Sequence, residues 1–391
     1  MGRGWDEQPR EIFGFVDEVH FNNPLDGYAR IVLHLDCVDQ EALVESIGAM
    51  RDEGNLALVR VITTLRALNR HFQISKLTEG QWIALRFERK QGMPRAWVLP
   101  ASHDYRLGRP TNVVSMKILP DHDPLVHKLS TACQFMQAPP QPVALASAFQ
   151  QHANSLSGKI QIQALDVGQA SSAVFLVDGL PIGFFDVGAP IWFNQKSISS
   201  SYKPPLVRKG FVMLSHWDFD HIDQARRFPQ LQSLDWFAPD QPVGPNTVKL
   251  QEKIGSRLTF VHGSATFNRR IHIAPGTSTD PKDRNGTGYA MRVEQGAEIA
   301  LLLGDSDYSY VQTHMLAGAT ALTIPHHGGR GSVPHAPAGG SGIAIASYGN
   351  PNSYKHPHEP HLDAHASLGW NVARTAHHSS SGTPRGNRWL L

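Results

Sequence analysis

The stretch Phe211-Val-Met-Leu-Ser-His216-Trp-Asp218-Phe-Asp220-His221-Ile222 places four potential metal ligands directly after a short apolar run. The apolar residues predict a buried strand. Residues two apart at the end of a strand point to the same side, so His216 and Asp218 can bind one cation, and Asp220 and His221 face a second position. Imidazole nitrogen and carboxylate oxygen together suit Zn²⁺, Mn²⁺ or Fe. A helix N-cap beside a solvated histidine explains one such residue, but the cluster favours a metal site.

Two later apolar runs also end in potential ligands. Ala300-Leu-Leu-Leu-Gly-Asp305 ends in a carboxylate, and Leu322-Thr-Ile-Pro-His326-His327-Gly ends in two histidines. A single histidine beside glycine is usually a turn residue, whereas two at a strand end favour a functional role. Which of the two would bind a metal stays open.

The sequence Asp-Val-Gly occurs twice after an apolar run, at Asp166 and at Asp186. A carboxylate in this position can cap a turn. It can also accept a hydrogen bond from loop amides or from a metal-binding histidine, which it then orients, but for either aspartate taken alone we favour the turn cap.

Taken together, these motifs over residues 159–391 resemble the metallo-β-lactamase-fold hydrolases. Asp218 stands where most of these enzymes have a second histidine, and this variant is typical of the ComEC-like hydrolase domain of DNA-uptake proteins. The resemblance implies an α/β fold of the αββα sandwich type with two divalent metal ions, Zn or Mn. It further implies that Asp305 bridges the ions, that His326 or His327 binds the second ion, and that Asp220, Asp305 and His356 serve catalysis.

The resemblance has a gap in the first metal site. The histidine that many of these enzymes carry between the motifs is replaced by Ala274-Pro275, which leaves His262 or His272 as substitutes. The first ion would then have only His216, Asp218 and the shared Asp305. We therefore expect the first site to be the weaker one.

Composition limits the classes of protein to which the chain can belong. Its 391 residues are 41% hydrophobic and 18% charged, which is typical of a globular protein. No apolar run is long enough to span a bilayer and no secretory signal is present, so we expect a cytoplasmic protein. The two cysteines, Cys37 and Cys133, form no C-x-x-C pair and predict buried free thiols. A net charge of +2 does not by itself indicate nucleic-acid binding.

Changes in composition and in hydrophobic pattern along the sequence predict three segments. Residues 1–118 form an accessory α+β or β-barrel-like module, with strands at 11–18 and 28–36 around a turn at 22–27 and helices at 41–50 and 56–68. An OB-type barrel, which binds single strands, is one alternative. Residues 119–158, rich in Pro, Gln and Ala, form a linker with a helix at 144–155. Residues 159–391 form the hydrolase domain, in which the pattern predicts strands at 160–165, 173–177, 183–185 and 211–214 and helices at 222–228, 246–254, 308–316 and 360–368.

A basic cluster lies in the first module and consists of Arg86, Arg89, Lys90 and Arg95. Lysine and arginine commonly protect the edge strand of a sheet, and we favour that interpretation over nucleic-acid contact. The module could also bind a protein partner.

Two classes of function fit the sequence. The first is a metal-dependent hydrolase, a phosphodiesterase or nuclease; the resemblance implies nucleic acid, DNA above all, as the substrate, and other branches of the family cleave esters or cyclic nucleotides. The second is a nucleic-acid-binding or scaffold protein with a remnant site. The complete set His216, Asp218, Asp220, His221 and Asp305 argues for the enzyme.

Overall fold

A computed structural model of the chain describes residue 5 and residues 10–21, 28–105, 108–137, 141–332, 335–376 and 384–391. The chain divides into two compact units. One consists of residues 1–136 and 242–253 and is called the barrel unit below; the other consists of residues 137–241 and 254–391 and is called the sandwich unit. Among the described residues, no helix combines the length and the apolar character needed to cross a membrane.

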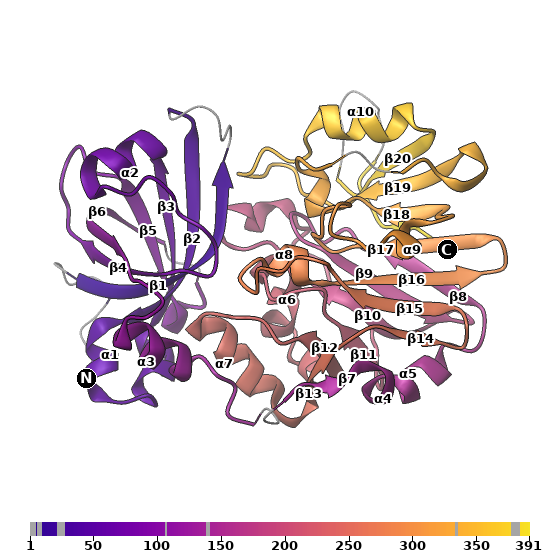
Figure 1. The fold of residues 1–391 in the computed structure, drawn as a ribbon, viewed down its shortest axis with the longest axis horizontal. Coiled ribbons are helices and arrows are strands. Elements are labelled where there is room, and N and C mark those ends of the chain that lie inside the picture. Colours follow the sequence, from indigo (N-terminus) through magenta and orange to yellow (C-terminus); the bar gives the residue numbers. More distant parts are fainter. Residues whose placement is uncertain are drawn as a thin grey trace. The chain divides into compact units, whose positions relative to one another are not determined.

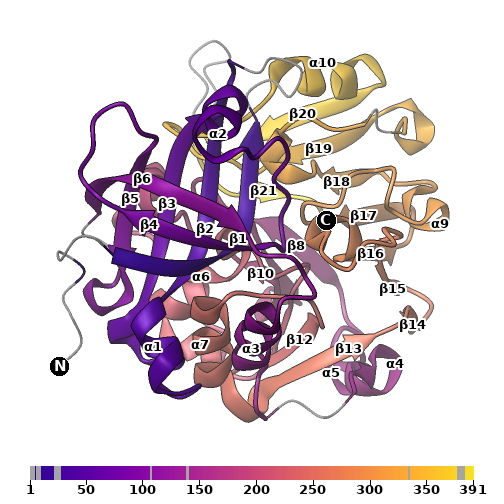
Figure 2. The ribbon, with the colours of Figure 1, turned by 60° about the vertical axis from the view of Figure 1, so that its left-hand side comes forward.

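The barrel unit is built on six antiparallel strands that close in the order β1-β2-β3-β5-β6-β4 (Figure 2). Alternate side chains such as Ile12, Leu33, Val59 and Leu85 fill its core. The barrel-like alternative predicted for this module is confirmed; the turn predicted at 22–27 lies outside the described residues. The strands are β1 (Arg10–Phe21), β2 (Arg30–Asp39), β3 (Leu56–Thr64), β4 (Trp82–Phe87), β5 (Arg95–Pro100) and β6 (Arg109–Ile118).

The helix predicted over residues 56–68 is wrong, because most of that range is strand β3. β3 pairs with β2 on one side and β5 on the other. The segment contains Val59, Val61, Ile62 and two threonines, and such β-branched residues favour a strand. The helix α2 (Leu65–Phe72) begins only after Thr64, whose side chain caps it.

A segment from far along the chain completes the barrel unit. The helix α7 (Pro245–Ile254) begins at the fully buried Asp36 of β2, which accepts hydrogen bonds from the backbone amides of Asn246 and Thr247 at 2.9 and 3.2 Å. Tyr105 donates to the side chain of the same asparagine at 2.6 Å. A carboxylate at a helix N-terminus is stabilised by the helix dipole and the free amides. The other helices of this unit are α1 (Gln40–Glu45) and α3 (Pro124–Ala132).

The sandwich unit consists of two mixed sheets that share one core (Figure 1). The first sheet has the order β21-β8-β9-β10-β11-β12-β13-β7 and the second β14-β15-β16-β17-β18-β19-β20. Phe175 and Phe211 of the first sheet belong to the same buried cluster as Ile273 and Met291 of the second. A further apolar cluster joins the second sheet to the helices α9 and α10. The metallo-β-lactamase-like architecture expected for this part of the chain is confirmed by this arrangement.

The elements of the sandwich unit agree with most of the predicted ranges, including the strands predicted at 160–165, 173–177 and 211–214. The helix predicted at 144–155 is divided into two short helices. The segment 119–158, which was predicted to be a linker, contains these two helices together with a strand and a further helix. The strands are β7 (Val143–Ala144), β8 (Ile160–Ala164), β9 (Ser172–Val177), β10 (Leu180–Val187), β11 (Phe211–Met213), β12 (Asp235–Pro239), β13 (Leu258–His262), β14 (Ala265–Phe267), β15 (Ile271–Pro275), β16 (Tyr289–Gln295), β17 (Glu298–Leu302), β18 (Ala321–Thr323), β19 (Gly342–Ala346), β20 (Trp370–Arg374) and β21 (Arg388–Trp389). The helices are α4 (Leu145–Ala148), α5 (Gln150–Ser155), α6 (Phe219–Arg227), α8 (Arg284–Thr287), α9 (Thr313–Leu316) and α10 (Glu359–Ser367).

Candidate metal centre

The candidate ligands come from the ends of parallel strands in both sheets. In the first sheet β10, β11, β12 and β13 run parallel, and in the second β17, β18, β19 and β20 do. The carboxyl ends of parallel strands meet at one edge of a sheet. His216 follows β11, Asp305 follows β17 and His327 follows β18, while Asp220 and His221 lie in the first turn of α6.

Four side chains converge on one point and are called the four-ligand cluster below: Asp220, His221, Asp305 and His327. His327 Nε2 lies 3.0 Å from Asp220 Oδ2 and 3.7 Å from Asp305 Oδ2. His221 Nε2 lies 3.2 Å from Asp305 Oδ1 and 3.9 Å from Asp220 Oδ1. Around a tetrahedral Zn²⁺ with bonds of about 2.0–2.1 Å, donor atoms lie about 3.3 Å apart. The donor types therefore suit a metal ion, and the spacings between neighbouring donors are close to this value. Asp220, His221 and His327 form one group of donor atoms within 4.8 Å of one another, and His221 and Asp305 form a second such group with His216.

Both histidines of the cluster are held with Nε2 facing inward. Asp186, fully buried at the end of β10, lies 2.8 Å from Nδ1 of His221, and the backbone carbonyl of Ser347 lies 2.9 Å from Nδ1 of His327. An acceptor on Nδ1 keeps the proton there and leaves the lone pair on Nε2 for a metal. Within the part of the chain that the structure describes, neither buried Nε2 has a hydrogen-bond partner. Such orphaned buried nitrogens fit a metal site.

The charges of the cluster compensate one another when no ion is bound. Burial by itself lowers the pKa of His327, but Asp305 and Asp220 outweigh burial and raise this pKa to about 9. Burial raises the pKa of Asp305, but the nearby histidines, His327 foremost, hold it well below its ordinary value. The histidines thus carry protons that a divalent cation would displace, so metal binding would release protons.

Two glycines allow the backbone segments to approach the cluster. A Cβ on Gly188 would lie 1.7 Å from the backbone oxygen of Asp220, so only glycine lets the Asp186 loop meet the start of α6. Gly304 has a φ of +57°, and a Cβ there would lie 2.6 Å from Ser215. Glycine before Asp305 therefore sets the carboxylate against the end of β11.

His216 and Asp218 lie beside the cluster with different partners. Nδ1 of His216 lies 2.9 Å from the Ser215 hydroxyl, and its Nε2 lies 3.2 Å from Asp218 Oδ2. The other oxygen of Asp218 lies 2.8 Å from Nη2 of Arg284, a side chain that is only 1% exposed. In the sequence, Arg284 carries no signal of a site, because an arginine shortly before a glycine is an ordinary turn residue.

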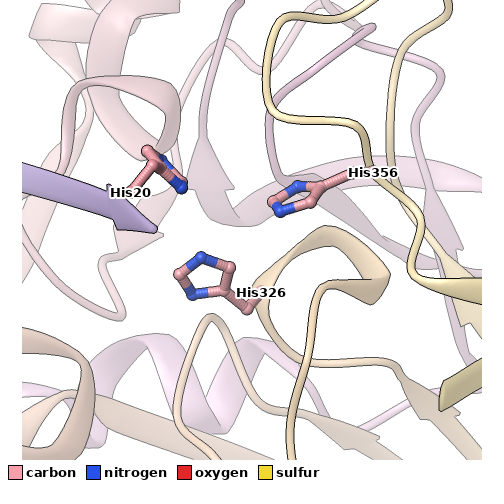
Figure 3. Close-up of side chains that lie close together, drawn as sticks. All are labelled: His20, His326 and His356. Carbon is pink, nitrogen blue, oxygen red and sulfur yellow. The ribbon is translucent and has the colours of Figure 1, made fainter. Parts of the chain in front are cut away.

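The two adjacent histidines, His326 and His327, have different surroundings in the structure. His327 points into the cluster, whereas the His326 side chain is 31% exposed and its Nδ1 lies 3.5 Å from Asp305 Oδ2. Figure 3 shows His326 near His356, with ring centroids 5.5 Å apart. The geometry favours His327 as the ligand and places His326 at the margin of the cluster.

His356, which the resemblance suggested as a catalytic residue, lies beside the cluster and outside it. Its ring stacks on that of His327 with centroids 6.1 Å apart. The side-chain amide of the buried Gln169 lies 3.0 Å from its Nδ1, and Gln169 in turn accepts from the Gly349 amide. Gln169 thus fixes the orientation of this ring.

Neither proposed substitute for the missing histidine reaches the centre. His272 contacts Thr266 and Glu294 on the strands β14 to β16, at 3.0 and 3.3 Å. His262 is exposed at the end of β13. Neither residue therefore adds a ligand to the first site.

A cavity of about 150 Å³ opens next to Asp305. Its wall contains both cationic and neutral hydrogen-bonding side chains. Asp307 holds the segment that carries Arg330, because its carboxylate accepts from the amide of Ser332 at 2.7 Å and from its hydroxyl. The lining residues are Asn285, Asp305, Asp307, Tyr310, Pro325, His326, Arg330, Gly331 and His361.

We expect Asp186→Asn to lower the affinity for Zn²⁺ or Mn²⁺ by roughly 10- to 100-fold, the usual effect of losing such an orienting partner. One carboxylate oxygen of Asp186 accepts from the Ser215 amide, which the asparagine oxygen can replace. The new amide would then face Nδ1 of His221 as a donor and move the ring proton to Nε2, where it blocks the metal. Calorimetric titration of metal-free protein measures the change.

The matched control for this variant is Asp166→Asn. Asp166 stands in the same Asp-Val-Gly sequence but pairs with Arg385, at 2.6 Å. Its affinity should equal that of the wild type. Equal affinity in both variants would contradict the role assigned to Asp186.

Comparison with known proteins gives structural similarity without sequence similarity. No family model matches the sequence, and no curated protein matches it. The metallo-β-lactamase fold protein YhfI from Bacillus subtilis is 14% identical, with 59% of this chain and 100% of that chain covered and a TM-score of 0.34. Isothiocyanate hydrolase from Delia radicum gut bacteria is 11% identical (55% and 96% covered, TM-score 0.36), and Zn²⁺-bound PqqB from Methylobacterium extorquens is 12% identical (55% and 97%, TM-score 0.34). With similarity this distant, the fold described above rests on the strand order and core of the chain itself.

Proposed function

We propose that the chain is a metal-dependent hydrolase that holds its ion in the four-ligand cluster. The observation that carries this proposal is the convergence of two carboxylates and two oriented imidazole nitrogens, whose neighbouring donor atoms lie 3.0–3.9 Å apart. In a cluster with a purely structural role, both ring nitrogens of a buried histidine would ordinarily have hydrogen-bond partners. Here the Nε2 atoms of His221 and His327 have none among the described residues, and both face the centre of the four-ligand cluster.

The chemistry would combine the ion with groups of the chain. A divalent ion in this position acts as a Lewis acid and lowers the pKa of coordinated water to about 7. His356 is placed to supply a proton to the leaving group: because Gln169 donates to its Nδ1, the neutral ring carries its proton on Nε2. Gln169 therefore acts as a positioning residue.

A phosphodiester is the substrate class that the surroundings favour. Arg330 lines the cavity beside Asp305, together with Tyr310 and Asn285. A guanidinium group binds phosphate oxygens in a planar, two-point geometry. The cavity thus offers a cation and two neutral hydrogen-bonding groups next to the proposed ion.

Nucleic acid as the substrate is supported by a groove of about 640 Å³ in the barrel unit. Arg89, Lys90 and Arg95 line it together with Trp97. The barrel is closed, so β4 and β5 have neighbours on both sides and the edge-strand interpretation of this basic cluster loses its basis. Cations beside an aromatic ring suit the backbone and bases of a single strand. This groove supports nucleic acid, DNA above all, as the substrate that we propose.

The experiment that tests the proposal compares substrates on one metal-loaded preparation. Protein freed of metal by a chelator and reloaded with Zn²⁺ or Mn²⁺ is assayed with bis(p-nitrophenyl) phosphate, a cyclic nucleotide, p-nitrophenyl acetate and single- and double-stranded oligonucleotides. We expect cleavage of phosphodiesters only with metal, and oligonucleotides to be preferred. Hydrolysis of the ester alone would remove the phosphodiester assignment, and bound metal with no turnover would favour a scaffold.

We expect Arg330→Ala to raise KM for bis(p-nitrophenyl) phosphate by about 10-fold and to change the metal content little, since one hydrogen bond to a charged group contributes about 1.5–3 kcal/mol. Steady-state kinetics and metal analysis measure the two effects. Arg269→Ala removes an exposed arginine from the turn between β14 and β15 and serves as the control. An unchanged KM in Arg330→Ala would remove this cavity from the substrate site.

A further inference from the structure

We propose that the centre binds a single divalent ion and that the guanidinium of Arg284 takes the place of a second one. This inference rests on the proposed function, because it concerns the number of ions at the same centre. The family resemblance implied two ions, the first held by His216, Asp218 and Asp305. The residues around Asp218 do not fit that arrangement.

Arg284 is held against Asp218 by the fold of its own segment. It is the first residue of α8, whose N-cap Asp283 accepts from the Gly286 amide at 2.7 Å. Its backbone carbonyl accepts from the side-chain amide of Gln241 at 2.8 Å. The chain after α8 returns to the end of β11, where the amide of Tyr289 donates to the Ser215 carbonyl at 2.9 Å. The guanidinium is therefore a built component of the centre.

The ion pair with Arg284 withdraws Asp218 from metal binding. Both side chains are buried, at 1% and 8% exposure, and Nη2 lies 2.8 Å from Oδ1. A buried carboxylate and guanidinium compensate each other's charge, and separating them leaves an uncompensated buried charge. A cation that recruited Asp218 would have to displace the guanidinium or lie beside it, and like charges repel strongly in a buried site.

Too few donors remain for a second ion. Asp218 Oδ2 lies 3.2 Å from His216 Nε2, but it belongs to the carboxylate that Arg284 holds. Among the described residues, the side chains that form a group of mutually close donor atoms with His216 are those of His221 and Asp305. His221 has one lone pair to offer, because Asp186 holds its Nδ1, and that lone pair faces the four-ligand cluster. A second ion would keep His216 and one shared oxygen of Asp305, whereas catalytic zinc sites have about three protein ligands.

The ion pair with Arg284 also affects the charge balance of the centre. Because the guanidinium compensates the charge of Asp218, this carboxylate needs no second metal ion as its counter-charge. We therefore expect full activity at one equivalent of metal.

The test measures the number of metal ions bound per chain. Metal-free wild-type protein is titrated with Mn²⁺ or Zn²⁺, the bound metal is measured after desalting, and the Mn²⁺ form is examined by electron paramagnetic resonance. We expect one ion per chain, the spectrum of an isolated Mn²⁺, and activity that is complete at one equivalent. Arg284→Ala, which releases Asp218, should bind about two ions per chain, and Arg284→Lys, which keeps the charge, should still bind one.

The outcomes separate this inference from the proposed function. Two ions per wild-type chain, or the spectrum of a coupled Mn²⁺ pair, would overturn the inference and leave the hydrolase intact. No bound ion in the wild type would overturn both. If circular dichroism shows that Arg284→Ala is unfolded, Arg284→Met keeps the apolar stem without the charge; one ion per chain in a folded variant of either kind would show that Arg284 does not exclude the second ion.

Discussion

Asp220→Ala is expected to abolish metal-dependent hydrolysis and to reduce bound metal to a small fraction of the wild-type content. Asp220 contributes one oxygen 3.0 Å from His327 Nε2 and another 3.9 Å from His221 Nε2, so alanine removes a donor from the middle of the four-ligand cluster. Loss of an orienting partner costs roughly 10- to 100-fold in metal affinity, and loss of a ligand should cost more. Elemental analysis and the phosphodiester assay measure both effects.

The same variant should remain folded. The carboxylate of Asp220 lies in the first turn of α6, where it interacts favourably with the helix dipole. Removing it costs about 0.3–1 kcal/mol, which is small compared with the stability of a domain of this size. Asp223→Asn is the matched control, since Asp223 lies one turn later and pairs with Arg226 and Arg227. It should keep metal and activity; metal content as high in Asp220→Ala as in this control would refute the assignment of Asp220 as a ligand.

The second large effect is expected from His327→Ala, compared with His326→Ala. His327 is buried and oriented by the Ser347 carbonyl, and its Nε2 faces both Asp220 and Asp305. Its loss leaves three ligands, so metal affinity should fall by more than about 100-fold, beyond the effect of losing an outer partner. Calorimetric titration with Zn²⁺ measures the affinity, and turnover at saturating metal measures any remaining catalysis.

His326→Ala provides an adjacent control of the same residue type. Because its side chain is partly exposed and its nearest cluster atom is 3.5 Å away, its loss should change metal affinity by less than about 10-fold, within the range of outer partners. A larger loss in His326→Ala than in His327→Ala would exchange the two assignments.

The local pattern of the sequence was sufficient to predict several features of the sandwich unit. Apolar runs that end in Asp or His marked the strand ends, and helices were predicted near α6 and α10 from their apolar spacing. Contact with a histidine of the site was the less favoured of the two roles predicted for a carboxylate after an apolar strand, and Asp186 makes such a contact with His221. These features depend on residues near one another in the chain, which is why periodicity and spacing reveal them.

The spacing of residues in the sequence could not show which of His326 and His327 is the candidate metal ligand. Both residues have positive φ, 51° and 54°, so the backbone there follows a tight turn and the alternation of a strand does not apply. Which ring turns inward depends on the Ser347 carbonyl, which lies 20 residues later in the chain. Strand β3 was likewise mistaken for a helix, because its apolar residues also match a helical spacing and only its pairing with β2 and β5 decides between the two.

Local sequence therefore determined the kinds of candidate metal ligand and their places at the strand ends. The tertiary structure decided which of these side chains lie together and which pair with other residues. Arg284 meets Asp218 across 66 positions of the chain, and the helix α7 meets Asp36 across more than 200. Neither contact leaves a trace in the periodicity of either segment, because periodicity reports only which face of its own strand or helix a residue occupies. Burial makes these contacts decisive: a charge removed from water must find its counterpart, wherever in the chain that counterpart lies.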